Sequence, residues 1–171
     1  MCKIVNGLEE NVVLSASWDK TVRMWKLSQT GGTCILTISK DEAAVWTVLQ
    51  PKVDLIVTGS ADKTIKLFLP NGNLVKKLTG TSESLLLTCL QKREFIQYFL
   101  VGHSDVVRDI AKLNDEEILS CANDATIRRW SLRSGECLET LYGHPNFIYR
   151  FVLCVENSHV KDSYFKVMFY L

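Results

Sequence analysis

The sequence predicts an all-β chain that repeats one four-stranded unit, and three observations carry this prediction. A phrase made of an apolar strand, a turn with an aspartate and a second strand occurs three times, at residues 14–25, 57–68 and 117–130. The turn aspartates Asp19 and Asp62 lie 43 residues apart, a spacing typical of repeats with four strands per unit. Short apolar runs rich in β-branched residues alternate with polar turns and show no helical period. The chain is therefore expected to be a β-repeat protein.

Each unit is expected to supply four strands in chain order, with one further strand after the third unit. Turns are expected at Gly31-Gly32, Pro70-Asn71-Gly72 and Arg133-Ser134-Gly135, because these residue types adopt the backbone angles of tight turns. The expected strands are 2–5, 12–15, 22–27 and 34–38 in the first unit; 45–50, 55–58, 64–69 and 74–78 in the second; 106–113, 117–120, 126–132 and 137–141 in the third; and 147–153 after it.

The third unit comes late in the chain, because Asp62 and Asp124 are 62 residues apart. Removing the 22 residues 81–102 restores a spacing of 40. We therefore divide the chain into a repeat region over 1–153, interrupted by an insertion at 81–102, and an irregular tail over 154–171. The insertion is expected to protrude with low order. Two origins stay open for it, a retained intron and a genuine loop.

Composition disfavours several function classes. A net charge of +1 over 171 residues gives no field that would draw the chain to nucleic acid. The six cysteines are scattered without a CxxC pair, so we expect free thiols, no metal and no cofactor. The sequence shows neither a signal peptide nor an apolar run of the roughly 20 residues that span a membrane. The cytoplasm or the nucleus is the expected location.

Basic residues alternate through the strands and turns of the repeats. This pattern indicates solvated blade faces better than a nucleic-acid stripe. The residues concerned are Lys20, Arg23, Lys26, Lys63, Lys66, Arg128 and Arg129.

Specific residues connect the repeat to a known family. Gly-His pairs at 102–103 and 143–144, the turn aspartates, and the tryptophans Trp25 and Trp130 resemble the WD-repeat family over roughly residues 1–153. The resemblance implies a β-propeller, in which four-stranded blades surround a central axis. Three blades fall short of the four to eight that close a ring. We therefore expect an open arc of three blades plus one strand of a fourth, with exposed apolar surface at both ends and poor solubility.

One phrase is more specific than the general WD pattern. The sequence Asn-Asp-Ala-Thr-Ile-Arg-Arg-Trp at 123–130, together with Ala-Val-Trp-Thr-Val at 44–48, resembles the family of the phospholipase-A2-activating protein, called Doa1 or Ufd3 in yeast. The resemblance implies a ubiquitin-binding propeller that acts in ubiquitin-dependent protein turnover. It also implies a Cdc48-type AAA ATPase as a partner, through further domains that this sequence does not contain.

The third unit holds the four residues of a WD hydrogen-bond network: His103, Ser120, Asp124 and Trp130. A buried turn carboxylate needs donors, and an imidazole can connect it to a strand hydroxyl that also accepts the indole N–H. The alternative for serine, histidine and aspartate together is a hydrolytic triad. It is disfavoured because the aspartate lies in a repeated turn and no nucleophile elbow accompanies the serine. We therefore expect a structural role and no enzyme activity.

The second unit departs from this pattern. Asp41 stands where a histidine is expected, and Phe68, which has no indole donor, replaces the tryptophan. Thr58 and Asp62 are therefore expected to lack their full network. On this ground, Asp62→Ala should cost less stability than replacing the turn aspartate of the third unit.

One rim of such a propeller is lined by the residue before each turn aspartate and by residues that enter each innermost strand. Aromatic residues and an arginine on one rim have the composition of an interaction hot spot. An alternative for Trp18 and Trp46 is that they only fill gaps between blades. The predicted partner-binding rim consists of Trp18, Ala61 and Asn123 in the turns, and of Cys2, Trp46, Arg108 and Tyr149 at the strand entries.

The expected function is a non-enzymatic protein-interaction module. The resemblance implies ubiquitin or ubiquitinated proteins as the partner on this rim. The alternative is a general WD-repeat scaffold that grips another peptide or protein with the same residues. Neither nucleic acid nor a membrane is expected as a partner.

Overall fold

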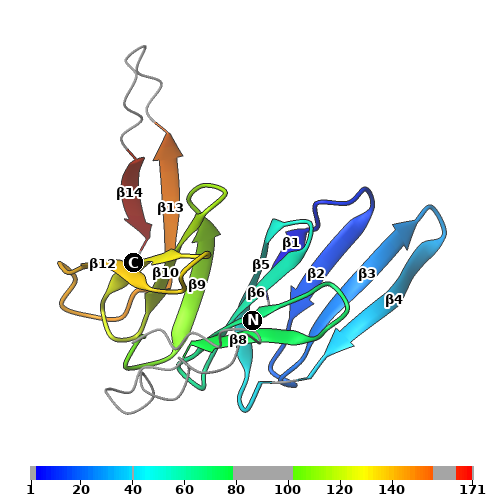
Figure 1. The fold of residues 1–171 in the computed structure, drawn as a ribbon, viewed down its shortest axis with the longest axis horizontal. Coiled ribbons are helices and arrows are strands. Elements are labelled where there is room, and N and C mark those ends of the chain that lie inside the picture. Colours follow the sequence, from blue (N-terminus) through cyan, green and yellow to red (C-terminus); the bar gives the residue numbers. More distant parts are fainter. Residues whose placement is uncertain (1–2, 40, 79–101, 156–164, 171) are drawn as a thin grey trace, which may run out of the picture.

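Figure 1 shows a computed structural model of the chain, and the structure describes residues 3–39, 41–78, 102–155 and 165–170. The described residues form strands and no helix. This part of the chain therefore has no helix that is long and apolar enough to span a membrane. The strands are β1 (Ile4–Asn6), β2 (Val12–Ala16), β3 (Val22–Ser28), β4 (Gly31–Ile38), β5 (Val45–Lys52), β6 (Leu55–Ser60), β7 (Ile65–Phe68), β8 (Leu74–Leu78), β9 (Val107–Lys112), β10 (Glu117–Ala122), β11 (Ile127–Ser131), β12 (Cys137–Leu141), β13 (Arg150–Val155) and β14 (Phe165–Tyr170).

The strands form three four-stranded antiparallel sheets and one two-stranded sheet. Each four-stranded sheet takes its strands in chain order, and we call β1–β4, β5–β8 and β9–β12 blades 1, 2 and 3. The blades follow one another through their first strands, since β5 contacts both β1 and β9, and β9 contacts β13. This arrangement confirms the predicted open arc of three blades, with β13 in the place of the first strand of a fourth.

The same turn joins the second and third strands of every blade. Asp19, Asp62 and Asp124 occupy it, and one side-chain oxygen of each accepts the backbone N–H two residues later at 3.0 Å. The residue after each aspartate has a left-handed backbone, with φ between 60° and 70°. Short acceptor side chains stabilise such turns from within. The repeated Asp-x-Thr sequence therefore explains why the hairpin recurs.

The third strand of each blade has a register shift directly before its aromatic residue, which is Trp25, Phe68 or Trp130. A register shift of this kind turns the following side chain relative to the sheet. Phe68 and Trp130 are almost completely buried, at 0% and 1% exposure, because each packs against the preceding blade. Trp25 has no preceding blade among the described residues and stays half-buried.

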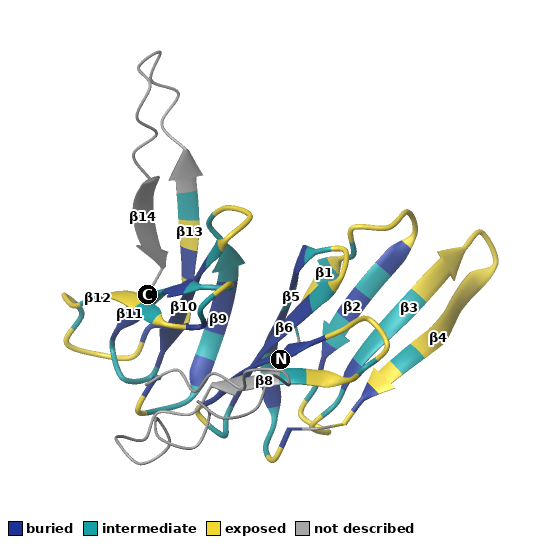
Figure 2. Ribbon diagram, viewed as in Figure 1, coloured by how far each residue is buried: buried dark blue, intermediate teal, exposed yellow. Residues whose placement is uncertain are grey.

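Apolar side chains fill the spaces between the sheets. Blades 1 and 2 enclose one cluster, blades 2 and 3 a second, and blade 3 and β13 a third. Blades 2 and 3 approach closely at Gly59, where an added Cβ would lie 2.6 Å from the side chain of Thr47 and 2.7 Å from that of Val107. Figure 2 shows that β5, β6 and β10 are mostly buried, whereas β4 at the edge of blade 1 is mostly exposed.

Two predicted strand starts, those of β4 and β13, differ from the structure by three residues. The turn between β3 and β4 falls at residues 29–30, because the strand pairing continues to Ser28 and Gly31. Gly31-Gly32 therefore begins a strand and does not form the turn. The innermost strand of the fourth unit begins at Arg150, three residues later than predicted, and the residues before it belong to the rim described below.

The tail also differs from the prediction of an irregular segment over 154–171. β14 pairs antiparallel with β13 through six residue pairs, so the fourth sheet has a second strand. The alternation of apolar residues at Phe165, Val167 and Phe169 is typical of a strand, and the prediction overlooked it because no turn aspartate announces this hairpin. The predicted insertion at 81–102 lies, apart from its last residue, outside the described residues.

Candidate functional site

A continuous row of rings and one guanidinium crosses the rim of the arc. The rings of Trp18 and Trp46 meet edge to face, with centroids 5.3 Å apart. Cζ of Arg108 lies 4.4 Å from the ring centroid of Trp46 and 5.2 Å from that of Tyr149. The ring of Phe147 follows, 6.4 Å from Tyr149. We call these five residues the aromatic row.

The fold brings the aromatic row together from four sheets. Trp18 lies in the aspartate turn of blade 1, and Trp46 and Arg108 are at the starts of β5 and β9. Tyr149 precedes β13 directly. Backbone hydrogen bonds fix turns to strand entries, including Val45 N–H to the carbonyl of Ser17 at 3.0 Å. Each turn therefore lies beside the start of an innermost strand, as the sequence argument assumed.

Asn123 orients the arginine of the row. Its Oδ1 accepts a hydrogen bond from Nε of Arg108 at 2.8 Å. Ala61, also predicted for the rim, lies at the matching turn of blade 2, where its backbone N–H donates to the carbonyl of Ala44 at 2.9 Å. The side chain of Ala61 is a methyl group and not an aromatic ring, so Trp46 is the one residue of blade 2 in the row.

Most of the predicted rim is thus assembled, and its binding role stays a prediction. Trp18, Trp46, Arg108, Tyr149 and Asn123 lie in or against the row, whereas Cys2 is outside the described residues. Phe147 was missed because the matching positions of the other units hold Ala44 and Val106, which carry no ring. Its signal was present, since it lies two residues before Tyr149 in a segment that also follows a Gly-His pair.

The row combines exposed rings with a buried donor. Trp18 is 63% exposed, Tyr149 54% and Phe147 43%. Trp46 is half-buried, and its indole Nε1 is buried without a hydrogen-bond partner among the described residues. Trp46 therefore does help to fill the space between neighbours, while the outer rings remain open. Exposed aromatic rings that cluster in this way are characteristic of interaction surfaces.

The predicted network of blade 3 is formed. Nδ1 of His103 lies 2.9 Å from Oδ2 of Asp124, and Nε2 lies 2.7 Å from Oγ of Ser120. The indole Nε1 of Trp130 donates to the same Oγ at 2.7 Å. Ser120 is 0% exposed, so its hydroxyl is closed to substrate. The burial of this hydroxyl and its bond from Trp130 support the structural interpretation over the hydrolytic triad.

Burial decides the protonation of this network. It lowers the pKa of His103 below its ordinary value, although Asp124 acts in the opposite direction. For Asp124, burial opposes ionisation, but hydrogen bonds from His103 and Thr126 outweigh it and hold the pKa of the carboxyl well below its usual value. At neutral pH a neutral imidazole therefore donates from Nδ1 to a carboxylate and accepts at Nε2 from Ser120.

Blade 2 contains a buried ion cluster that the sequence argument missed. Nζ of Lys66 donates to Oδ1 of Asp41 at 2.6 Å and to Oδ2 of Asp62 at 2.5 Å. Lys66 is 1% exposed, so its predicted place on a solvated face is wrong. Burial raises the pKa of Asp62. The hydrogen bonds from Lys66 and Thr64 lower it by a larger amount, so the pKa of this carboxyl lies below its ordinary value. An available signal was the joint change of histidine to aspartate and of arginine to lysine relative to blade 3.

Blade 1 keeps half of the network. Nε1 of Trp25 donates to Oγ of Ser15 at 2.9 Å, as Trp130 does to Ser120 in blade 3. The side chain of Asp19 is 51% exposed and accepts from Thr21 within its own turn. The described residues contain no group of three or more potential metal ligands.

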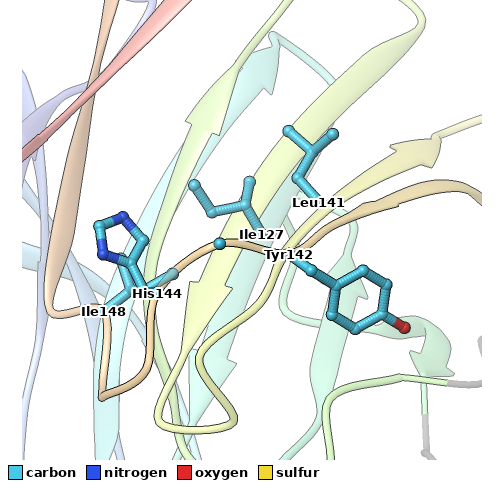
Figure 3. Close-up of a pocket in the computed structure, with 6 residues that line it drawn as sticks. Ile127, Leu141, Tyr142, His144 and Ile148 are labelled. Atoms are coloured by element: carbon cyan, nitrogen blue, oxygen red, sulfur yellow. The ribbon is translucent and has the colours of Figure 1, made fainter.

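A small hollow lies at the end of blade 3, and Figure 3 shows its walls. It is lined by Ile127, Leu141, Tyr142, Gly143, His144 and Ile148. Ile127 and Leu141 are paired neighbours on β11 and β12, in the positions that Val22 and Ile38 hold against Phe68 in blade 1. The hollow therefore has the lining that receives an aromatic side chain of a following blade. It shares no residue with the aromatic row.

Comparisons with known proteins agree with this architecture. The profile of the WD40 family, described as "WD domain, G-beta repeat", matches residues 3–26, 32–69 and 94–131, which together exceed half of the chain. The third match begins inside the segment that we treated as an insertion. Strands β1–β7 and β9–β11 lie within these ranges or overlap them, whereas β8 and β12 lie outside them.

Individual relatives point in the same direction. WD repeat-containing protein pop2 of Schizosaccharomyces pombe is 31% identical over 83% of this chain and 22% of its own length. Protein DOA1 of Saccharomyces cerevisiae is 32% identical over 84% of this chain and 17% of its own length. The chain thus spans about a fifth of these relatives.

A solved structure extends the likeness to three dimensions. The WD40 β-propeller domain of Doa1 superposes with a TM-score of 0.65 at 30% identity, covering 85% of this chain and 41% of that chain. The partial coverage matches three blades taken from a larger ring. The chain therefore belongs to the WD-repeat family of β-propellers, with a sequence and a fold near those of Doa1.

Proposed function

We propose that this chain binds ubiquitin or ubiquitinated proteins through the aromatic row. The observation that carries the proposal is the row itself, because residues from separate sheets converge on one exposed rim. The partner's identity comes from the resemblance to the phospholipase-A2-activating family and from the similarity to Doa1. WD-repeat propellers in general serve as scaffolds for protein partners, which supports binding over catalysis.

The physical properties of the row suit a small partner. A small partner such as ubiquitin would cover the row with a compact apolar patch, so the rings of the row would supply most of the contact energy. Arg108 would instead meet a carbonyl or an acidic group at the edge of the patch. An interface confined to one rim falls at the low end of the size range. We therefore expect a dissociation constant on the order of micromolar or weaker.

A second candidate function is a WD-repeat scaffold for a different protein. The diversity of the relatives favours keeping it, since they include pop2 and the mitochondrial division protein 1 of Schizosaccharomyces pombe. Cooperation with a Cdc48-type ATPase belongs to the ubiquitin proposal and would require parts of the longer relatives. Action in the cytoplasm or the nucleus is part of the same proposal.

A titration of labelled ubiquitin with the purified chain tests the proposal. Trp46→Ala and Arg108→Ala should each weaken binding by at least about fivefold, since buried aromatic and arginine residues dominate such interfaces. Arg129→Ala is the matched control, because Arg129 lies on β11 beside Glu139, at 3.6 Å, and outside the row. Circular dichroism should show that all variants keep the same strand content.

The outcomes separate the partner from the site. Without saturable binding of ubiquitin by the chain, the ubiquitin proposal fails and the general scaffold replaces it. If ubiquitin binds equally well to the parent chain and to both row variants, the partner is right and the site is wrong.

A further inference from the structure

We infer that Arg108 binds a carboxylate of the partner, so that the recognised segment carries an acidic residue beside apolar side chains. The inference rests on the proposed function, because it assigns a chemical class to the ligand of the same aromatic row. The rings would provide contact area, while Arg108 would select among partners.

Three neighbours hold the guanidinium of Arg108 in one orientation. Rings of Trp46 and Tyr149 lie 4.4 Å and 5.2 Å from its Cζ, and Asn123 accepts from its Nε at 2.8 Å. These contacts come from three different elements: the start of β5, the segment before β13, and the β10–β11 turn. A guanidinium that is fixed before binding loses less conformational entropy when a ligand arrives.

The donors that remain on this guanidinium are open to a ligand. Within the described parts of the chain, Nη1 and Nη2 of Arg108 have no hydrogen-bond or ion-pair partner, and neither is buried. By contrast, Lys66 lies between two aspartates and Arg129 beside two glutamates. Two parallel N–H groups match the two oxygens of a carboxylate.

The charge of the row favours a carboxylate over a phosphate. Phosphorylated segments are typically recognised by clusters of arginines, and the aromatic row contains one cation. A single guanidinium balances the single charge of one carboxylate. A neutral amide would also accept hydrogen bonds, but without the added strength of a charged pair.

The surroundings of Arg108 define what should flank the carboxylate. The exposed rings of Trp18 and Tyr149 lie on opposite sides of it along the row. Apolar side chains on both sides of an acidic residue would cover these rings and exclude water from the ion pair. Exclusion of water strengthens a charged hydrogen bond. The expected ligand is therefore a short segment with an acidic residue between two apolar ones.

The test compares two peptides that differ in one group. Both are acetylated and amidated; one reads Leu-Ser-Glu-Ser-Phe and the other Leu-Ser-Gln-Ser-Phe. Each is titrated into the chain at pH 7 and low salt, while NMR follows the indole N–H signals of Trp18 and Trp46 and the Nε–H signal of Arg108. The glutamate peptide should bind at least about fivefold more tightly, and added salt should reduce this preference.

Variants of the chain separate the role of Arg108 from general charge. Arg108→Lys keeps the positive charge but not the two planar donors, so the preference should fall below about twofold. Asn123→Ala frees Nε and should reduce the preference while leaving the weak affinity for the glutamine peptide unchanged, as expected for a positioning residue. Arg129→Lys, outside the row, should bind both peptides as the parent chain does.

Three results would overturn the inference: equal affinity for the two peptides, no saturable shift with either peptide, or an undiminished preference in Arg108→Lys. The failure of the proposed function is distinguishable from these. Ubiquitin binding without any peptide preference would leave the partner in place and remove the carboxylate. Peptide preference without ubiquitin binding would keep the carboxylate and point to another acidic partner.

Discussion

Blades 2 and 3 use the same aspartate turn, yet different side chains donate to its second carboxylate oxygen. In blade 3 a neutral imidazole, that of His103, donates to Oδ2 of Asp124 at 2.9 Å. In blade 2 a buried ammonium, that of Lys66, donates to Oδ2 of Asp62 at 2.5 Å. In both blades a backbone N–H from the loop before the first strand adds a second donor. The turn itself is unchanged, since its inner bonds are alike.

The difference shows that the turn requires a donor and not a histidine. An ammonium beside one carboxylate still lacks partners for its other protons, and Asp41 at the histidine position supplies one. The aspartate at the histidine position and the lysine at the arginine position are therefore electrostatically linked. They also remove the reason for expecting Asp62→Ala to cost less than Asp124→Ala, because Asp62 does have a buried side-chain donor.

The largest expected effect comes from removing the ammonium of blade 2. Lys66→Met should destabilise the chain by about 3–5 kcal/mol, because it leaves Asp41 and Asp62 buried together without a cation. Urea denaturation followed by circular dichroism measures this difference. Arg23→Met is the matched control: it changes the same repeat position in blade 1, where the side chain is 43% exposed and 4.0 Å from Asp19. A control that cost as much as Lys66→Met would contradict the buried ion cluster.

The next effect concerns the centre of the blade 3 network. Ser120→Ala should cost about 1–3 kcal/mol, because it removes the acceptor of the Trp130 indole and the donor to His103 inside the core. The same denaturation experiment measures it. Ser15→Ala removes the acceptor of Trp25 in blade 1, where the indole is only half-buried, and should cost less. Equal costs would mean that burial does not set the value of this bond.

Features set by residues close in sequence could be predicted from the sequence. The Asp-x-Thr turns and the short strands repeat, so each copy supports the assignment of the others. The aromatic row followed from the same periodicity, because Trp46, Arg108 and Tyr149 occupy equivalent positions in successive units. Phe147 has no counterpart in the other units, and periodicity therefore gave no reason to include it.

The buried ion cluster of blade 2 could not be predicted from the periodicity. Lys66 and Asp41 are separated by 25 residues, and the alternation along β7 gave no hint that a lysine was inside. Every residue of β7 is buried, since blades pack on both faces of blade 2. A periodicity argument assumes one solvated face, which a central blade does not have. The signal for this cluster was the joint change of histidine to aspartate and of arginine to lysine relative to blade 3, which a search for the repeat pattern treats as a loss.

Acid should affect the two networks in different pH ranges. Because the folded pKa of His103 lies below its ordinary value of about 6.5, the unfolded chain binds that proton more readily. The stability that blade 3 gains from neutral His103 is therefore present above about pH 6.5 and lost as pH falls toward the folded pKa. The lowered pKa of Asp62 gives blade 2 stability that is present above about pH 4 and lost only below it.

Denaturation curves between pH 7 and pH 5 measure this difference. The unfolding free energy should fall with pH by up to about 1.4 kcal/mol per unit, the limit for one proton. His103→Gln should flatten the slope, since glutamine does not titrate. The parent chain, measured over the same pH range, is the control. A full slope in His103→Gln would assign the acid sensitivity to another group.

The smallest expected effect is at Thr58, and its sign distinguishes the two blades. Thr58 is the counterpart of Ser120, is 0% exposed, and its Oγ1 has no hydrogen-bond partner among the described residues. Phe68 cannot donate to it, and Asp41 is engaged with Lys66. Replacing a buried, unpaired hydroxyl by a methyl group of the same shape removes a desolvation cost without opening a cavity. Thr58→Val should therefore leave stability unchanged or raise it by about 1 kcal/mol, as measured by urea denaturation, whereas Ser120→Ala lowers it. If Thr58→Val destabilises the chain as much as Ser120→Ala does, the hydroxyl of Thr58 has a partner and blade 2 keeps more of the WD network than its ion cluster indicates.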